Sequence, residues 1–174
     1  MLGPALGLLA LLGLAGGCIA PAEDVSRMLQ RLEGAAGAEG PPDPSVLLAL
    51  NLAGAGGCAR CKELLQRLRE AAVERAAKDM TSGELALYVL AFLSSCESPR
   101  AVQAPAGTVD VLSWLQLRTD EEVAHLELEG TPRTTFYQLG LDVTALCVAG
   151  TGAYELAAVK LAKEVLRAGE QLSV

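Results

Sequence analysis

Apolar residues recur at helical spacing along most of this chain, and they define two kinds of helix that alternate. Three segments are apolar on nearly every side: residues 45–53, 83–95 and 136–148. Three others carry apolar residues on one face and charged residues on the other: residues 60–78, 108–127 and 154–168. A helix that is apolar all round is typical of a buried position, whereas an amphipathic helix lies between core and solvent. The pattern therefore predicts an all-α fold of alternating inner and outer helices.

Two of the inner helices resemble each other in sequence, which supports a structural repeat. Five residues of one align with five of the other: Glu84, Leu85, Leu87, Val89 and Ala91 with Gln138, Leu139, Leu141, Val143 and Ala145. Alternation of buried and half-buried helices fits an α/α toroid, in which parallel inner helices begin at one rim. The unpaired N–H groups and positive dipole ends at that rim attract polar ligand groups. We expect a partial toroid, an open arc whose uncovered apolar edge recruits partners or self-associates.

Helix-start and linker signals flank these segments. Asp43-Pro44 is typical of an N-cap followed by the first helical residue, and residues 81–84 (Thr-Ser-Gly-Glu) form a capping box. A shorter amphipathic helix is expected over residues 24–34, followed by a linker over 34–44 that is rich in Gly and Pro. The Pro-rich residues 99–107 are expected to form a loop, and no stretch predicts a β-strand.

The first seventeen residues carry no charged side chain and end in the small residues Ala15-Gly16-Gly17. This pattern indicates a secretory signal peptide, residues 1–17, with cleavage before Cys18, although the basic residues that usually open such a signal are missing. A buried N-terminal helix is the alternative. Beyond this segment no window is long and apolar enough to span a membrane. The sequence therefore predicts a secreted, extracellular protein with one domain over residues 18–174.

Charge and single polar residues narrow the function further. The net charge is −7 and there is no long basic run, which argues against nucleic acid as a partner. The single histidine, His125, lies in a charged segment and is interpreted as a solvated helix residue.

The five cysteines are an odd number, so at least one has no partner inside the chain: Cys18, Cys58, Cys61, Cys96 and Cys147. Secretion would favour disulfides. Cys58-Ala59-Arg60-Cys61 is compatible with a redox motif or with half of a zinc site. Those sites need a βαβ context or a second pair of ligands, which the sequence lacks. We favour a local disulfide or two thiols at a helix start.

Three stretches resemble the family of vitamin B12 (cobalamin) carriers, which comprises transcobalamin, intrinsic factor and haptocorrin: DPSVLLALNLAGA, GELALYVLAFLSSCESP and TTFYQLGLDVTALC. They occur in the family's order and spacing, include Cys96 and Cys147, and are most similar to transcobalamin. The resemblance implies an α/α barrel whose inner-helix mouths hydrogen-bond cobalamin amides, followed by a β domain that clamps the ligand. It implies ligand contacts for Thr134 and Tyr137, and it places Glu84 where the family usually has Gln.

The same resemblance covers only the N-terminal half of the barrel and none of the β domain. Leu172 falls where transcobalamin places a cobalt-coordinating His, and the family's ligand-contacting Asp-Thr motif would follow Val174. The resemblance also implies that Cys18, Cys96 and Cys147 pair with cysteines outside this sequence. We therefore expect weakened or lost cobalamin affinity, and free thiols or intermolecular bridges.

Three functions follow as alternatives. The first is a cobalamin-binding transport protein without a catalytic cofactor, in which Thr134, Tyr137, Gln138 and Glu84 contact the ligand. The second is a truncated relative that acts through protein contacts instead, with a cell-surface receptor or with itself. The third is an α/α hydrolase that uses Asp142 with Glu84 as its second carboxylate, which we disfavour because no metal-binding residues or other carboxylates accompany them. Taken alone, Tyr137 and Gln138 are explained equally well as capping and packing residues.

Overall fold

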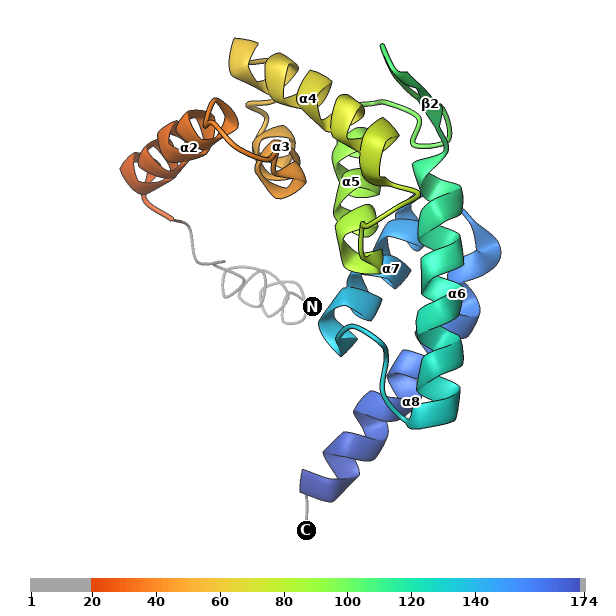
Figure 1. Ribbon diagram of the computed structural model, residues 1–174. Coiled ribbons are helices and arrows are strands. Elements are labelled where there is room, and N and C mark those ends of the chain that lie inside the picture. Colours follow the sequence, from red (N-terminus) through yellow and green to blue (C-terminus); the bar gives the residue numbers. More distant parts are fainter. Residues whose placement is uncertain (1–19, 173–174) are drawn as a thin grey trace, which may run out of the picture.

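The computed structural model describes residues 20–172, and its helices follow one another in an open arc (Figure 1). This part of the chain contains seven α-helices: α2 (Ala22–Ala36), α3 (Pro44–Leu52), α4 (Ala59–Arg75), α5 (Ser82–Ser94), α6 (Val111–Glu129), α7 (Phe136–Val148) and α8 (Glu155–Leu172). A short 3-10 helix, η1 (Gly152–Tyr154), precedes α8. The expected signal peptide, residues 1–17, and Cys18 lie outside the described residues. The all-α fold expected from the apolar pattern is confirmed.

A small hairpin replaces the loop that was expected over residues 99–107. Strand β1 (Val102–Ala104) pairs antiparallel with β2 (Gly107–Val109). Gly107 has a φ angle of 149°, which favours glycine, and it begins the return strand. Val102 is buried in the core. The prediction that the chain has no strand was therefore wrong here. One buried apolar residue and one glycine after a two-residue turn are enough to form this short hairpin.

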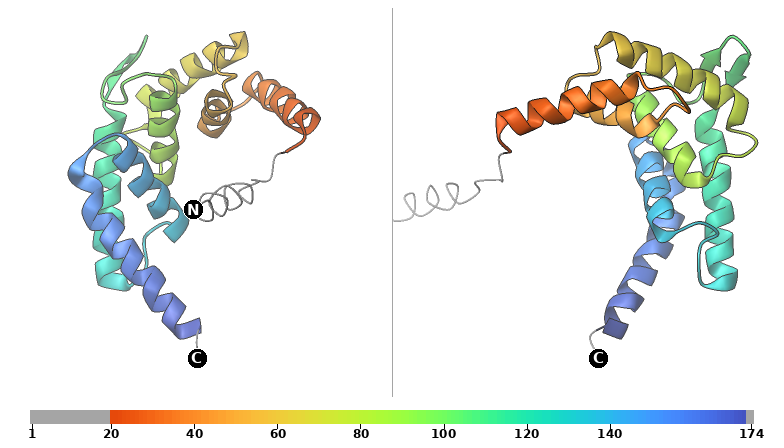
Figure 2. Two further views of the ribbon diagram at one scale, coloured as in Figure 1. Left: turned by 180° about the vertical axis from the view of Figure 1, so that it is seen from behind. Right: turned by 60° about the vertical axis from the view of Figure 1, so that its left-hand side comes forward.

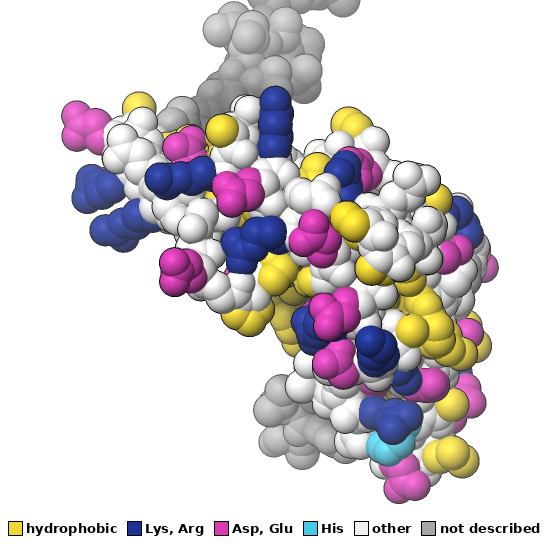
Figure 3. Space-filling view, turned by 45° about the horizontal axis from the view of Figure 1, so that its top comes forward, with side chains coloured by type: hydrophobic (Ala, Val, Ile, Leu, Met, Phe, Trp, Pro, Cys, Tyr) yellow, Lys and Arg dark blue, Asp and Glu magenta, His cyan; other side chains and the backbone are white. Residues whose placement is uncertain are grey.

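The three apolar helices lie in a row, with α5 between α3 and α7 (Figures 1 and 2). The chain passes between members of the row through α4 and then α6, and each of these packs against both of its neighbours in the row. On the face shown in Figure 3, acidic and basic side chains intermingle at the surface. The alternation of inner and outer helices agrees with the sequence pattern. The described residues do not close into a ring, so the toroid stays a prediction.

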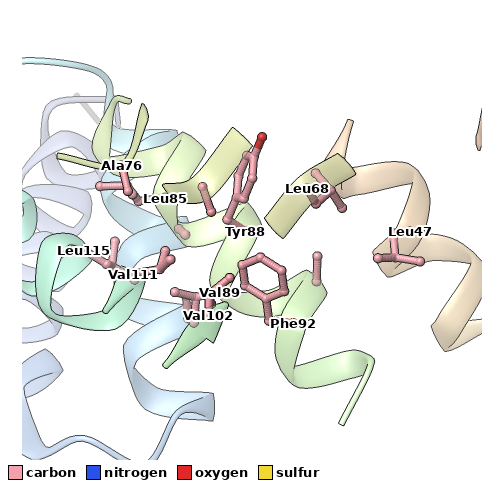
Figure 4. Packing of buried hydrophobic residues seen from close by; sticks show 14 of the residues in the cluster. Leu47, Leu68, Ala76, Leu85, Tyr88, Val89, Phe92, Val102, Val111 and Leu115 are labelled. Atoms are coloured by element: carbon pink, nitrogen blue, oxygen red, sulfur yellow. The ribbon is translucent and has the colours of Figure 1, made fainter. Parts of the chain in front are cut away.

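The centre of the core is α5, which is buried along almost its whole length. Tyr88 and Phe92 pack edge to face, with ring centroids 6.1 Å apart. Leu47 of α3, Leu68 of α4 and Leu115 of α6 belong to the same buried apolar cluster (Figure 4). Burial of one large apolar side chain contributes about 1.5–3 kcal/mol, so this helix holds the others together.

The three apolar helices were expected to be nearly fully buried along their middles, which is confirmed for α5 but not for α7. In the middle of α7, Leu139 and Asp142 are buried, Leu141 and Val143 are half-buried and Thr144 is exposed. The reason is the number of neighbours. Helix α5 has an inner helix on each side, whereas α7 has only α5 as an inner neighbour within residues 20–172. The predicted linker also begins too early, since α2 continues to Ala36.

Side-chain caps begin five of the described helices, including α4, where Cys58 Sγ accepts from Cys61 N. The Asp43 carboxylate accepts from Ser45 N at 2.9 Å, and Thr81 Oγ1 accepts from Glu84 N at 3.2 Å. Asp110 and Thr135 cap α6 and α7 in the same way. Such caps contribute about 1 kcal/mol each. The capping box at residues 81–84 is only half formed, because the Glu84 side chain pairs with Arg75 instead.

Gly83 lets the first turns of α5 and α7 approach closely. A Cβ atom at this position would lie 2.6 Å from Gln138 Cγ and 2.9 Å from Gln138 Cβ. We expect Gly83→Ala to lower the free energy of unfolding by about 1–3 kcal/mol through overpacking. Urea unfolding followed by circular dichroism measures this change. Gly34→Ala in α2 is the control, because nothing lies within 4 Å of its Cβ position and an alanine there stabilises a helix by up to about 1 kcal/mol. Equal stabilisation by both variants would contradict the close approach.

Candidate functional site

The N-termini of α3, α5 and α7 meet at a pocket of about 630 Å³, which we call the helix-start mouth. Each helix start contributes four residues: Pro41, Pro42, Asp43 and Pro44 before and in α3; Thr81, Gly83, Glu84 and Leu87 at α5; Thr135, Tyr137, Gln138 and Leu141 at α7. The shared rim expected for parallel inner helices is thus present in this part of the chain. N–H groups and positive dipole ends of three helices face one space.

Three of the four residues expected to contact a ligand line this mouth: Glu84, Tyr137 and Gln138. Thr134 does not line it. Its backbone N–H donates to Glu122 Oε2 at 3.0 Å, so this residue is held against α6. Its neighbour Thr135 lines the mouth and caps α7, accepting from Gln138 N at 3.1 Å. The helix start therefore presents the threonine one position later than the sequence suggested.

Glu84 is paired with a cation at the side of the mouth. Arg75 Nη1 donates to Glu84 Oε1 at 2.8 Å, and Nη2 lies 3.4 Å from Oε2. The hydrogen bond to Glu84 raises the pKa of Arg75 above its already high value, so the guanidinium stays charged. The negative charge that Glu84 brings to the mouth is therefore partly offset.

The mouth combines apolar walls with polar atoms at its edge. Leu87 and Leu141 are half-buried there and face the prolines before α3. Tyr137 is 76% exposed. Gln138 Oε1 is buried and has no hydrogen-bond partner within residues 20–172. A buried acceptor without a donor is costly, so this oxygen is suited to an N–H or O–H group of a ligand or of water.

Asp142 is fully buried between α5, α6 and α7 and does not line the mouth. Neither of its oxygens has a hydrogen-bond partner among the described residues. Burial raises the pKa of Asp142 from 3.8 to about 7, and repulsion from the buried Glu122 adds to the rise, while the Ser82 hydroxyl opposes it. The hydrolase hypothesis required Asp142 and Glu84 at a common mouth, and the two carboxylates are not placed together in that way.

We expect Asp142 to make the fold more stable in acid than at alkaline pH. The pKa of Asp142 is higher in the folded than in the unfolded chain. Its contribution to the free energy of unfolding therefore falls as the pH rises from about 4 to about 7, and it does not change further above that range. The loss should be on the order of 4 kcal/mol. Asp142→Asn should remove it, so that the variant matches the unmodified chain at pH 4 and exceeds its stability at pH 8.

Urea unfolding at a series of pH values measures this difference. Asp120→Asn is the matched control, because Asp120 is an exposed carboxylate on α6. It should change stability little at any pH. If Asp142→Asn and Asp120→Asn give the same pH profile, Asp142 is not a protonated buried acid.

The cysteines follow the interpretation favoured from the sequence. Cys58 and Cys61 form a local disulfide at the start of α4. Cys96 and Cys147 are exposed free thiols in the part of the chain that the structure describes. His125 lies on α6, where its Nδ1 donates to the carbonyl oxygen of Thr131 at 2.7 Å. No group of three or more His, Cys, Asp or Glu residues between positions 20 and 172 is arranged to hold a metal ion.

Sequence reasoning missed several residues of the mouth. Thr135 could have been found, because the N-cap preference that located Thr81 applies equally to the threonine before Phe136. Pro41 and Pro42 were assigned to a linker, since composition alone does not show where a linker packs. Arg75 belongs to an outer helix, and no local pattern indicates that its side chain reaches Glu84.

The chain matches the family described as eukaryotic cobalamin-binding protein over residues 6–174. It therefore belongs to that family. Within residues 20–172, no helix is both long enough and apolar enough to cross a membrane.

Within the aligned stretches, individual relatives are between 34% and 38% identical to this chain. Intrinsic factor of Canis lupus familiaris is 38% identical over 138 residues, which cover 79% of this chain and 29% of the relative. Transcobalamin-1 of Sus scrofa is 34% identical over 107 residues, covering 60% and 24%. Transcobalamin-2 of Homo sapiens is 36% identical over 66 residues, covering 38% and 15%. The chain thus spans between about one seventh and three tenths of the length of these relatives.

Proposed function

We propose that the helix-start mouth is one wall of a cobalamin site, and that the protein binds or carries vitamin B12. The observation that carries this proposal is the convergence of three helix N-termini on one pocket that Tyr137 and Gln138 line. Membership of the cobalamin-binding family supplies the ligand. The corrin ring of cobalamin has an apolar face, amide groups at its edge and a phosphate in its nucleotide tail, which suits a mouth of this kind.

Each part of the mouth has a matching group on this ligand. The apolar residues Leu87 and Leu141 would lie against the corrin. The Tyr137 hydroxyl and the unpaired Gln138 Oε1 would bond its amides, because a primary amide both donates and accepts. The helix starts would attract amide carbonyls and phosphate. Thr135 rather than Thr134 would be the threonine nearest the ligand, with Thr134 positioning the start of α7 through Glu122.

We further propose that this chain alone binds cobalamin weakly. The mouth is open and Tyr137 is largely exposed, so it can cover only one side of so large a ligand. Each hydrogen bond contributes about 1 kcal/mol, and association itself has a large entropic cost. In this proposal the function is binding, because the polar groups at the mouth serve recognition and the buried acids Glu122 and Asp142 do not line it.

Titration with cyanocobalamin, followed by absorbance and equilibrium dialysis, should show weak saturable binding. Tyr137→Ala should weaken it about tenfold or abolish it, since one hydrogen bond and an aromatic contact are lost. Phe136→Ala is the control, because Phe136 is also exposed at the start of α7 but does not line the mouth. It should leave affinity unchanged.

Charge at the mouth gives a second comparison within the same titration. Glu84→Gln should strengthen binding, because it removes a carboxylate and leaves Arg75 free to attract the ligand phosphate. Glu97→Gln breaks a similar pair, with Arg69, away from the mouth and should have no effect. Equal affinity for all four variants would show that the mouth only caps buried helices.

A second function, through protein contacts, is favoured by the apolar face of α8. Leu156, Val159 and Leu166 share one face of the helix and are between 51% and 69% exposed. Exposed apolar stripes of this kind mark sites where proteins associate. A chain that shows no cobalamin binding in the titration, yet forms dimers at micromolar concentration in analytical ultracentrifugation, would support this function over the first.

We also propose that the protein is secreted, with residues 1–17 as the signal peptide. The uncharged apolar run that ends in Ala15-Gly16-Gly17 supports this. N-terminal sequencing of protein collected from the medium of producing cells should begin at Cys18. A chain that stays in the cytosol with Met1 in place would contradict the proposal.

A further inference from the structure

Three side chains at and behind the helix-start mouth carry buried oxygen atoms that have no hydrogen-bond partner within residues 20–172. They are Ser82 of α5 and Gln138 and Asp142 of α7, and both carboxyl oxygens of Asp142 are among the unpaired atoms. Asp142 is 0% exposed and Ser82 is 2% exposed. We call these three residues the buried polar cluster. Because buried oxygens without a donor are costly, the cluster has to share the hydrogen atoms that its own members carry.

The packing of α5 against α7 brings the members of this cluster together. Gln138 and Asp142 are four positions apart in α7, so their side chains lie one turn apart on the same face of the helix. Ser82 directly precedes Gly83, and a Cβ atom on Gly83 would lie 2.9 Å from Gln138 Oε1. Burial raises the pKa of Asp142 to about 7, and the Ser82 hydroxyl lies close enough to oppose that rise. Ser82 is therefore adjacent to both other members.

The number of hydrogen atoms in the cluster decides which hydrogen bonds it can form. A serine hydroxyl has one hydrogen and can also accept, whereas a carboxylate and an amide oxygen only accept. When Asp142 is protonated, its O–H can donate to Ser82 Oγ, and the Ser82 hydrogen is available for Gln138 Oε1. When Asp142 is ionised, the Ser82 hydrogen goes to the carboxylate, because hydrogen bonds to a charged acceptor are the stronger ones. Gln138 Oε1 then loses its donor.

The charged and titratable groups on the elements packed against α7 are occupied elsewhere. Glu122 of α6 repels the Asp142 carboxylate, and it accepts a hydrogen bond from Thr134 N. Tyr154 of η1 lies beside Cys147, at the other end of α7. On α5, α6 and α8, further charged or titratable groups have partners of their own: Glu84 with Arg75, Arg118 with Glu121, Lys160 with Glu127, and His125 with the Thr131 carbonyl. None of these groups supplies a donor to the buried polar cluster.

We propose that Asp142 is a positioning residue for the helix-start mouth, which holds Gln138 in place through Ser82 when it is protonated and releases it when it is ionised. The inference rests on the proposed cobalamin site, because Gln138 lines the mouth. With Oε1 bonded from behind, the Gln138 amide presents its NH2 group to the ligand, where it suits carbonyl and phosphate oxygens. Contact through Oε1 is then confined to the ionised form. A side chain that is already fixed loses less entropy on binding, so the protonated form binds more tightly.

Nuclear magnetic resonance of the full chain, labelled with nitrogen-15, tests this link without any ligand. The side-chain NH2 signal of Gln138, assigned by its loss in Gln138→Leu, should shift between pH 5.5 and pH 8.5 with a midpoint of about 7, the pKa of Asp142. Asp142→Asn should abolish the shift. Ser82→Ala should remove most of it, because the hydroxyl between the two groups is gone while Asp142 remains. Asp120→Asn, which changes an exposed carboxylate on α6, is the control and should keep the shift.

Titration with cyanocobalamin at the same two pH values measures the consequence for binding. The affinity should fall about fivefold from pH 5.5 to pH 8.5, the equivalent of one hydrogen bond, and Asp142→Asn should bind equally at both.

Three results would overturn the positioning role of Asp142. They are a Gln138 signal that does not move in the unmodified chain, a shift that persists in Asp142→Asn, and saturable cobalamin binding of equal affinity at both pH values. A different result separates this role from the proposed function. If the Gln138 signal depends on Asp142 and Ser82 as expected but cobalamin is bound at neither pH, the proposed function is overturned and the positioning of Gln138 by Asp142 is supported.

Discussion

The close approach of α5 and α7 at Gly83 is the contact on which the rest of the structure depends. With no side chain at this position, Gln138 packs directly against the first turn of α5. Two helix starts therefore lie side by side, and together with the start of α3 they form the mouth. The same approach buries Ser82 and Asp142 behind it. A larger residue at position 83 would separate the two helices whose first turns carry Glu84, Tyr137 and Gln138 at the mouth.

Two carboxylates near this contact are accommodated in opposite ways. Glu84 forms an ion pair with Arg75, and both side chains are about one third exposed, so water still reaches them. Asp142 is fully buried, and none of the residues between 20 and 172 forms a salt bridge or hydrogen bond with its carboxylate. Burial of an unpaired charge costs more than protonation, so its pKa rises to about 7. Exposure to solvent, rather than residue type, decides whether a carboxyl group here pairs with a cation or has its pKa raised by burial.

The sequence was sufficient for the helices because each is specified locally. Apolar spacing located α3 to α8, and capping residues such as Asp43 and Thr81 placed two starts within a residue. The predictions that failed are those that depend on contacts between one helix and another. Apolar spacing shows that α7 can be buried all round, but not that its outer side lacks an inner helix. The choice between Thr134 and Thr135 depends on Glu122, a residue on another helix.

The candidate site was therefore predictable in its position and only partly in its members. Parallel inner helices require a common rim, and that requirement follows from their alternation with outer helices. Which side chains turn into the rim depends on tertiary contacts. Arg75 shows this most clearly, because it comes from the end of α4 and reaches a residue nine positions later. No periodicity encodes such a contact.

The pair formed by Glu84 and Arg75 also constrains how this surface can evolve. A change from glutamate to an uncharged residue at position 84 leaves an unpaired guanidinium at the mouth, and loss of the arginine alone leaves an unpaired carboxylate there. The effect of a change at one position therefore depends on the residue at the other, a case of epistasis between two positions. The two sites should consequently covary across lineages.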